Sequence, residues 1–310
     1  MNGTLLSSRA RLRLALLGPL ALAARWLPSG ASAANDATTP APGEPLTLVV
    51  GGLDTRQPDQ PENSDVLMIA RVDLAQKTVR AVSIPRDLYV QIPGIGYDKI
   101  TRAYDFGSNA GADTRDFAAG AALVESTIQT NFGLQTHGAV MTNFGGLAEI
   151  VDAFGGIEVA NPYDVYDSQY PTEDYGVKEI FFPAGQVHLS GTEALEFSRT
   201  RHQDGDDGRV MRQHLVLRAL LERARSPKTA PQLTALYKKH RKSVQTSLSK
   251  QQQLGLVLAA PSFSNDSVAF TSLINYVSPG STPEGMWIYS GDWSQIPAFV
   301  EGFLAGTIQS

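Results

Sequence analysis

The chain has 310 residues, of which 42% are hydrophobic and 18% charged, so its composition is that of a globular protein and excludes a wholly disordered one. Its 26 Lys and Arg residues against 31 Asp and Glu residues give a formal net charge of -5, and we therefore expect no nucleic-acid partner. The lack of cysteine excludes disulfides, thiolate metal sites and cysteine nucleophiles. An anion site in this chain must be a local cluster of positive charge.

Residues 1–33 have the order of a secretory signal peptide: arginines, an apolar run at 14–24, and the small residues of the Ala31-Ser32-Ala33 site. The apolar run ends at Arg25, short of the ~20 residues that a membrane-spanning helix needs. We therefore expect export with cleavage after Ala33, and a retained N-terminal anchor is the alternative.

Residues 34–46 contain three prolines and no apolar periodicity, which predicts a flexible linker ahead of a folded domain at 47–310. Short β-branched runs predict neighbouring strands at 46–53, 66–72 and 79–84.

Apolar residues recur at spacings of three and four up to Phe132, and this pattern predicts an amphipathic helix with Asp113 as its N-cap. Further along the chain, the patterns predict strands at 138–141, 157–160 and 268–274 and helices at 144–154, 191–197, 208–224 and 250–259. Strands and helices intermix without a break in composition, so we expect a single α/β domain with no internal repeat.

The usual enzyme signatures are missing from the sequence. It contains no phosphate-binding P-loop motif, no G-x-S-x-G nucleophile elbow and no H-E-x-x-H zinc helix. The five histidines show no metal-ligand spacing, and we interpret them as surface or packing residues.

Two acidic residues flank one loop near the start of the domain. Asp54 ends the first predicted strand and Asp65 opens the second. Carboxylates completed by waters and substrate phosphates are the usual ligands of Mg²⁺, so both are candidate metal ligands. The alternative is that each merely caps a turn.

Two further segments place basic residues at the ends of predicted elements. Arg86 directly follows the proline that ends the third strand, and Lys99 precedes a predicted helix whose start favours anions. A surface ion pair is the alternative interpretation for Arg86.

A third, denser cluster carries four arginines within fourteen residues, at positions 199, 201, 209 and 212. Arg199 and Arg201 point the same way if the chain leaves its helix extended, and Arg209 and Arg212 share the face of the next helix at its positive end. Guanidinium groups bind phosphate in a bidentate manner and keep their charge, so this cluster predicts a polyanion site. The alternative is a solvated run of charge.

Six ordered segments together resemble the LytR-CpsA-Psr family of cell-wall glycopolymer ligases. They are GLDTR at 52–56, SDVLMIARVD at 64–73, SIPRDLYVQIPG at 83–94, DKITRAY at 98–104, NFGGLAEIVDAFGGIEV at 143–159, and AGQVHLSGTEALEFSRTRH to DGRVMRQ within 184–213. The resemblance implies a mixed β-sheet flanked by helices, with an apolar tunnel that holds a polyprenyl chain. It also places the protein in the cell envelope, on the extracytoplasmic face of the membrane.

The resemblance further implies that Asp54 and Asp65 hold Mg²⁺. The implied pyrophosphate-binding set is Arg86, Lys99, Arg199, Arg201, Arg209 and Gln213, with Asp206 as a nearby acid; Arg212 is added from its place in the arginine cluster.

The implied reaction is attack by a hydroxyl of a cell-wall polymer on polyprenyl pyrophosphate that carries a glycan, at a membrane surface. We expect Asp54, Asp65, Arg86, Arg201 and Arg209 to be catalytic, with Asp54 or Asp65 as candidate proton acceptor. Two alternatives remain, namely a polyprenyl-pyrophosphate hydrolase and a noncatalytic protein that binds lipid-linked glycans.

Overall fold

The structure is a computed structural model that describes residues 43–54, 62–109, 115–172, 176–226 and 228–309. These residues belong to one compact unit. The expected signal peptide lies outside them. Within the described part of the chain, no helix has both the length and the apolar character needed to cross a membrane.

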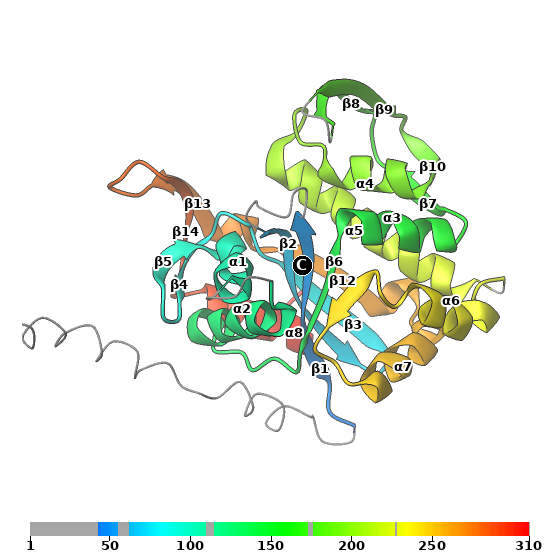
Figure 1. Ribbon diagram of the computed structural model, residues 1–310, viewed down its shortest axis with the longest axis horizontal. Coiled ribbons are helices and arrows are strands. Elements are labelled where there is room, and N and C mark those ends of the chain that lie inside the picture. Colours follow the sequence, from blue (N-terminus) through cyan, green and yellow to red (C-terminus); the bar gives the residue numbers. More distant parts are fainter. Residues whose placement is uncertain (1–42, 55–61, 110–114, 173–175, 227, 310) are drawn as a thin grey trace, which may run out of the picture. The chain divides into compact units, whose positions relative to one another are not determined.

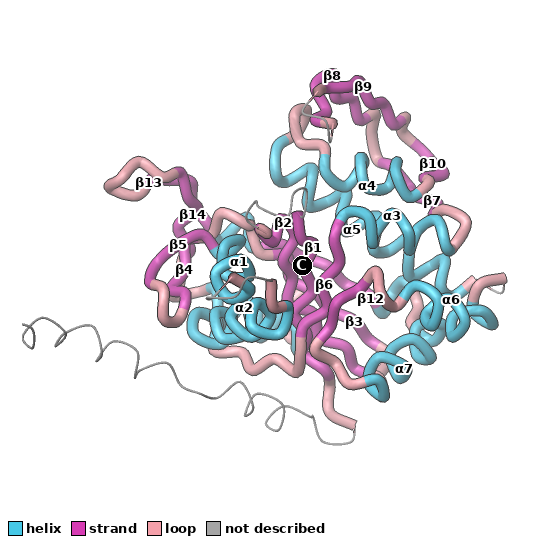
Figure 2. The backbone as a smooth tube through the Cα atoms, viewed as in Figure 1, coloured by secondary structure: helices cyan, strands magenta, loops and turns pink. Residues whose placement is uncertain are grey.

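A six-stranded mixed sheet forms the centre of the domain, in the order β11-β6-β1-β2-β3-β12 (Figures 1 and 2). Its strands are β1 (Leu46–Asp54), β2 (Asn63–Asp73), β3 (Thr78–Ser83), β6 (Ala139–Asn143), β11 (Val244–Thr246) and β12 (Val268–Ser272). β1 pairs parallel with β6, and β3 pairs parallel with β12, whereas the other pairs are antiparallel. The mixed α/β fold implied by the resemblance is confirmed.

Helices cover both faces of this sheet. The helices are α1 (Ala103–Ser108), α2 (Phe117–Phe132), α3 (Phe144–Ala153), α4 (Gly191–Arg199), α5 (Gly205–Arg225), α6 (Leu233–His240), α7 (Lys250–Ala259) and α8 (Ile296–Ala305). On one face, Val49 and Leu53 of β1 pack with residues of α1, α2 and α8 in the largest buried cluster. On the other, Leu46 and Leu48 pack with residues of α5 and α7. Successive side chains of a strand point to opposite faces, so the sheet separates two apolar layers, one on each face.

Four two-stranded antiparallel sheets accompany the central sheet, and three of them are hairpins of consecutive strands. They pair β4 (Tyr89–Ile92) with β5 (Gly96–Lys99), β7 (Ile157–Asn161) with β10 (Gly185–Leu189), β8 (Val165–Pro171) with β9 (Val177–Phe182), and β13 (Val277–Ser281) with β14 (Trp287–Gly291). Short 3-10 helices occur at 100–102, 230–232, 260–262, 265–267 and 273–276.

The structure corrects three expected boundaries. Helix α2 has Asp116 as its N-cap, whose carboxylate accepts hydrogen bonds from two backbone amides, while the expected cap, Asp113, lies outside the described residues. Helix α5 starts at Gly205 rather than Gly208, because Gly205 takes the left-handed conformation that turns the chain into the helix. The strand expected at 268–274 ends at Ser272, whose hydroxyl accepts from the next turn.

Candidate functional site

Asp65 owes its direction to a β-bulge in the pairing of β1 with β2. Gly52 pairs with Val66 and Leu53 pairs with Ser64, so Asp65 is an extra residue between the two pairs. In a regular strand, Asp65 would share the face of Leu67, which is buried in the opposite layer. The bulge instead presents Asp65 beside Val66, on the side of the sheet that faces α5.

Arg86 stands in the turn that follows β3. Its Nη1 donates to Oδ1 of Asp65 at 2.9 Å, and its Nε lies 3.4 Å from Oδ2 of Asp87. The other oxygen of Asp87 is 2.7 Å from Nζ of Lys99. Burial lowers the pKa of Arg86, but the carboxylates of Asp65 and Asp87 outweigh it and raise that pKa above its usual value.

Arg199 ends α4 and is held between two aromatic rings. Its guanidinium carbon lies 4.0 Å from the ring centroid of Phe144 and 5.7 Å from that of Tyr170, and Nη1 donates to the Tyr170 hydroxyl at 3.1 Å. Thr200 continues in extended form, and its buried hydroxyl donates to Asp167 at 2.6 Å. Arg201 follows two residues later, and both arginines line one cavity, although their heads lie at different places along it.

Arg209 and Gln213 stand one turn apart near the start of α5. Arg209 is buried, its Nη2 lies 3.3 Å from Asp206, and its Nε makes no hydrogen bond to any described residue. Burial lowers the pKa of Arg209; Asp206 opposes this effect, and the nearby cations Arg86 and Arg201 add to it. A buried guanidinium with an unused N–H among other cations is suited to an anionic ligand.

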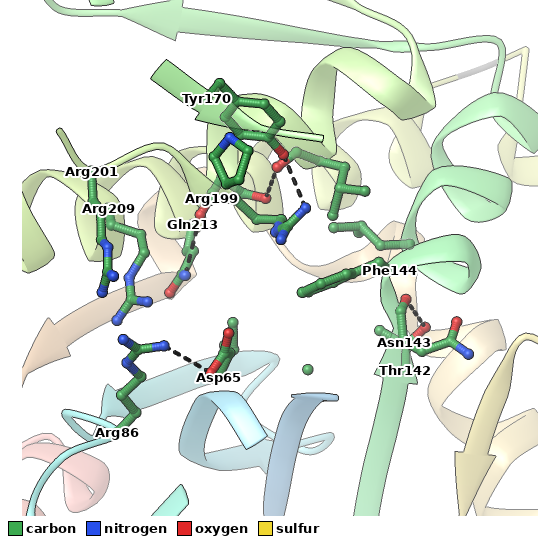
Figure 3. Close-up of a pocket in the computed structure, with 16 residues that line it drawn as sticks. Asp65, Arg86, Thr142, Asn143, Phe144, Tyr170, Arg199, Arg201, Arg209 and Gln213 are labelled. Carbon is green, nitrogen blue, oxygen red and sulfur yellow. Dashed lines mark hydrogen bonds and ion pairs between the residues drawn. The ribbon is translucent and has the colours of Figure 1, made fainter. Parts of the chain in front are cut away.

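These side chains surround a cavity of about 140 Å³ (Figure 3). Its lining residues are Gly52, Asp65, Val66, Arg86, Thr142, Asn143, Phe144, Leu147, Tyr170, Pro171, Leu195, Ser198, Arg199, Arg201, Arg209 and Gln213. The heads of Arg86, Arg201 and Arg209 point toward one another beside Asp65, and Arg199 lies across the cavity, between Tyr170 and Phe144. We call this set the arginine cavity.

Of the residues expected to bind the pyrophosphate, three lie outside this lining, as does the expected metal ligand Asp54. Arg212 is fully buried: it donates to the carbonyls of Phe197 and Thr200, and it pairs with Asp204 at 2.5 and 3.0 Å. This geometry corrects the expectation that Arg212 joins Arg209 in binding the ligand, because its three nitrogens already donate to Asp204 and the two carbonyls. Lys99 is paired with Asp87.

Asp206 lines a small adjoining recess that also contains Asp65 and Arg209. It therefore lies beside the arginine cavity, without lining it.

Three further residues shape the site, although their positions in the sequence did not mark them as candidates. Asp87 links Arg86 to Lys99, and Phe144 and Tyr170 hold Arg199. Phe144 lies in the segment 143–159, but nothing in its spacing links it to Arg199. Tyr170 lies in a hairpin that was not predicted, so no sequence signal could have selected it.

A second cavity, of about 310 Å³, lies between α3, α6, α7 and the edge of the sheet, and its walls are almost entirely apolar. Two elements line both cavities. On β6, Val140 lines the apolar cavity and Thr142 lines the arginine cavity. On α3, Ile150 lines the apolar cavity and Leu147 lines the arginine cavity. Val140 and Thr142 share a strand face, and Leu147 and Ile150 are neighbours on one helix face, so one wall runs from the cationic site into the apolar space.

Two acidic residues at or near the arginine cavity fit part of a magnesium shell. Among the described residues, no group of three or more His, Cys, Asp or Glu side chains could hold a metal. Asp65 lines the arginine cavity, and Asp54 lies two residues beyond Gly52, hence on the strand face that lines this cavity. Two carboxylates of this kind fit the usual protein share of a Mg²⁺ shell, which substrate phosphates complete.

Comparison with known proteins gives a consistent result. The model of the LytR_cpsA_psr family matches residues 29–301. A relative named polyisoprenyl-teichoic acid–peptidoglycan teichoic acid transferase TagU, from Bacillus anthracis, is 31% identical over 216 residues, 69% of this chain and 64% of the relative. The same-named protein of Oceanobacillus iheyensis is 30% identical over 246 residues, 79% of this chain and 70% of that one.

The match thus spans about 64% of the first relative's length. Among solved structures, B. subtilis TagV has a TM-score of 0.67 at 24% identity, covering 85% of this chain and 98% of that one. TagT bound to LIIa-WTA has a TM-score of 0.66 at 22% identity, covering 90% and 98%. These structures share the fold of the chain.

Proposed function

Because the chain belongs to the LytR-CpsA-Psr family, we propose that it transfers a glycan from a polyprenyl-pyrophosphate carrier to a hydroxyl of a cell-wall polymer. One observation carries the proposal: Arg86, Arg199, Arg201 and Arg209 come from three separate segments and meet around one cavity with Asp65. The names of the TagU relatives support a transfer from a polyisoprenyl carrier to peptidoglycan.

The arginine cavity suits a pyrophosphate. Several guanidinium groups, which cannot lose their charge, neutralise its phosphates. Arg86, Arg201 and Arg209 repel one another in the free protein, and bound phosphates would attract all three. Arg199 is oriented in advance by Tyr170 and Phe144, so little side-chain entropy is lost when it binds.

The apolar cavity suits the polyprenyl chain. Its wall continues from the arginine cavity along α3 and β6, so a phosphate held by the arginines leaves its prenyl tail next to an apolar surface. This cavity is our candidate for the tunnel that the family resemblance implies.

The proposed reaction is a phosphoryl transfer. The acceptor hydroxyl oxygen forms a bond to the glycan-proximal phosphorus, the bond from that phosphorus to the bridging oxygen breaks, and polyprenyl phosphate leaves. Asp54 or Asp65 accepts the hydroxyl proton, and the arginines stabilise the charge on the equatorial and leaving oxygens. A magnesium ion held by Asp54 and Asp65 would add charge neutralisation at the same oxygens.

We also propose that the protein works outside the cytoplasm, in the cell envelope, where the wall polymer is found. The leader-like order of residues 1–33 supports this location.

The test uses purified protein, Mg²⁺ and a lipid-linked glycan carrying a labelled sugar, with and without isolated wall polymer. We expect label on the polymer and release of polyprenyl phosphate. Release of a free glycan phosphate into water, at the same rate with and without acceptor, would instead identify a hydrolase. Tight binding without turnover would identify a noncatalytic binding protein. Either result contradicts the proposed transfer.

A further inference from the structure

The segment from Arg223 to Asn265 has a charge pattern unlike that of the rest of the chain. It contains eight Lys and Arg residues and no Asp or Glu, in a chain whose overall net charge is -5. The segment includes α6 and α7, which bound the apolar cavity. Two of the helices that bound the apolar cavity, α6 and α7, therefore carry only positive charges in an otherwise acidic protein.

The basic side chains in and next to α6 and α7 are exposed. Lys238 and Lys239 lie in the last turn of α6, Arg241 and Lys242 follow it directly, and Lys250 opens α7. No acidic residue of the segment can pair with them. Exposed cations concentrated in this way produce a local positive potential, which attracts an anionic partner.

Apolar residues are exposed beside these charges. Leu254 and Leu258 stand one turn apart on α7 and expose 38% and 62% of their surface. Each directly follows a residue that lines the apolar cavity, Gln253 and Val257 respectively. The exposed leucines therefore continue the apolar lining toward the outside of the molecule.

The two helices are joined at the cavity. Tyr237 of α6 and Gln253 of α7 both line it, and the Tyr237 hydroxyl donates to the Gln253 side chain at 2.7 Å. In Figure 1, α6 and α7 lie on the same side of the central sheet. The basic residues and the leucines thus belong to one surface around one opening, which we call the α6–α7 face.

We propose that the α6–α7 face docks on an anionic lipid bilayer, so that the apolar cavity opens onto the membrane and receives the prenyl chain there. This proposal rests on the proposed function, which identifies the ligand of the apolar cavity as a prenyl chain. Basic residues near an anionic bilayer and exposed leucines that enter its interfacial layer are the two attractions that a peripheral protein uses. An acidic or neutral partner without an apolar layer would leave Leu258 exposed to water.

The test compares full-length variants by cosedimentation with vesicles of phosphatidylcholine alone or with about one-third phosphatidylglycerol. The charge variant is Lys238→Gln with Lys239→Gln. Its control is Arg102→Gln with Lys178→Gln, which removes the same charge from exposed positions elsewhere. The N-terminal segment is common to all the proteins, so it does not contribute to differences between them.

We expect the charge variant to bind anionic vesicles about 25-fold more weakly than the unmodified chain, because each basic group near an anionic bilayer contributes roughly a factor of five. The control should lose much less, and added salt should weaken binding of the unmodified chain more than that of the charge variant. Leu258→Ser should weaken binding to both kinds of vesicle, with an unchanged thermal unfolding midpoint.

Equal binding of the charge variant and its control would overturn the docking proposal. Transfer from a short-chain, detergent-dispersed donor separates this result from the proposed function, since it requires no bilayer. Loss of vesicle binding with full activity in detergent supports docking. Activity in detergent without any selectivity for anionic vesicles overturns docking and leaves the transferase function standing, whereas docking without activity contradicts the function alone.

Discussion

The side chains of Arg86 and Asp65 form an ion pair, with 2.9 Å between Nη1 and Oδ1, at the wall of the cavity that both residues line. In the proposed function the two groups have different partners, a phosphate for Arg86 and a magnesium ion for Asp65. In the free protein, Arg86 and Asp65 therefore pair with each other, whereas the phosphate and the magnesium ion would separate them. Each member of the pair prevents the other from remaining an isolated, partly buried charge.

Asp65→Asn should change metal-free and metal-dependent binding in opposite directions. The amide keeps the shape of the side chain but releases Arg86 and removes a negative charge from beside the pyrophosphate, so binding of a polyprenyl pyrophosphate in the presence of a chelator should strengthen. The increase that Mg²⁺ causes in transfer rate should fall by more than about tenfold, because one of two carboxylate ligands is lost. Titrations with and without Mg²⁺ measure both effects.

Asp266→Asn is the matched control, since Asp266 is an exposed acid far along the sequence from the site. It should leave both binding and the response to Mg²⁺ unchanged. A variant Asp65→Asn that keeps its full response to Mg²⁺ would remove Asp65 from the metal site.

Arg209→Ala should weaken pyrophosphate binding by more than about tenfold, because truncating a buried, charge-assisted contact costs roughly 2 to 5 kcal/mol. Arg209→Lys should restore binding in part, since an ammonium keeps the charge but loses the bidentate geometry. Lys239→Ala, at an exposed position, is the control. Losses of the same small size in all three variants would show that the arginine cavity is ordinary charged surface.

Arg223 and Arg225 of α5 are not suitable controls, although they follow Arg209 on the same helix. Arg223 donates to the carbonyl of Phe154 at 2.7 Å, and Arg225 donates to the Asn265 side chain at 2.6 Å. Substitution of either would remove contacts between helix α5 and its neighbours. Residue spacing does not indicate these contacts, because both arginines lie beyond the segments that resemble the family.

Arg212→Ala should destabilise the protein by about 3 to 5 kcal/mol, because it leaves Asp204 and two carbonyl groups without their buried partner. The loss should appear as a lower denaturant midpoint, with the slope of the transition unchanged. Arg86→Ala, at a partly exposed position of the cavity wall, should change that midpoint much less. Wild-type stability in the Arg212 variant would contradict the structural role.

The buried His214 should make stability depend on pH. Burial, with a smaller effect of Arg218, lowers the pKa of His214 to about 4, and its Nε2 lies 2.7 Å from the Ser83 hydroxyl. The unfolded chain takes up the proton near pH 6.5 and the folded chain does so near pH 4, so stability is full above pH 6.5 and falls as pH decreases between these values. The loss should reach about 3 kcal/mol.

His214→Gln keeps a side chain that can bond Ser83 but cannot titrate. Its unfolding free energy should fall less steeply than that of the unmodified chain from pH 6.5 to pH 4, even if it is lower at pH 7. Parallel curves for the two proteins would show that His214 is not the titrating group.

The sequence predicted the main elements because each carries a local signal. The strands from β1 to β3 are β-branched runs bounded by Gly, Asp or Pro, and α2 has an apolar row that ends at Phe132 with Gly133 as its C-cap. The hairpins β8–β9 and β13–β14 were not predicted, since their alternation is interrupted by polar residues and prolines. Their existence depends on contacts with distant parts of the chain.

The site was predicted in part for the same reason. The spacing of Arg199 and Arg201 and the helix start at Arg209 predicted that all three would share one site, and they line one cavity. Arg212 shares the helix face pattern of Arg209, yet Asp204 and the end of α4 bind its guanidinium. Whether an arginine binds a ligand or a carboxylate of the protein depends on tertiary packing, and residue spacing does not encode that packing. The bulge at Asp65 is equally a matter of register between two strands.

Filling the apolar cavity should separate the binding of the prenyl chain from that of the pyrophosphate. Ala153 of α3 lines this cavity and is half-buried, so Ala153→Phe would place a large ring in the space proposed for the chain. Binding of a long-chain polyprenyl pyrophosphate should weaken by more than about tenfold, since every prenyl unit kept out of the cavity forfeits the burial of several CH₂-sized groups at ~0.8 kcal/mol each. Binding of a carrier with one or two prenyl units should be unchanged, because the arginine cavity alone can hold it. Ala298→Phe, at an exposed position of α8, controls for the added ring. Isothermal titration with the two carriers measures the difference, and an equal loss for both would place the prenyl chain elsewhere.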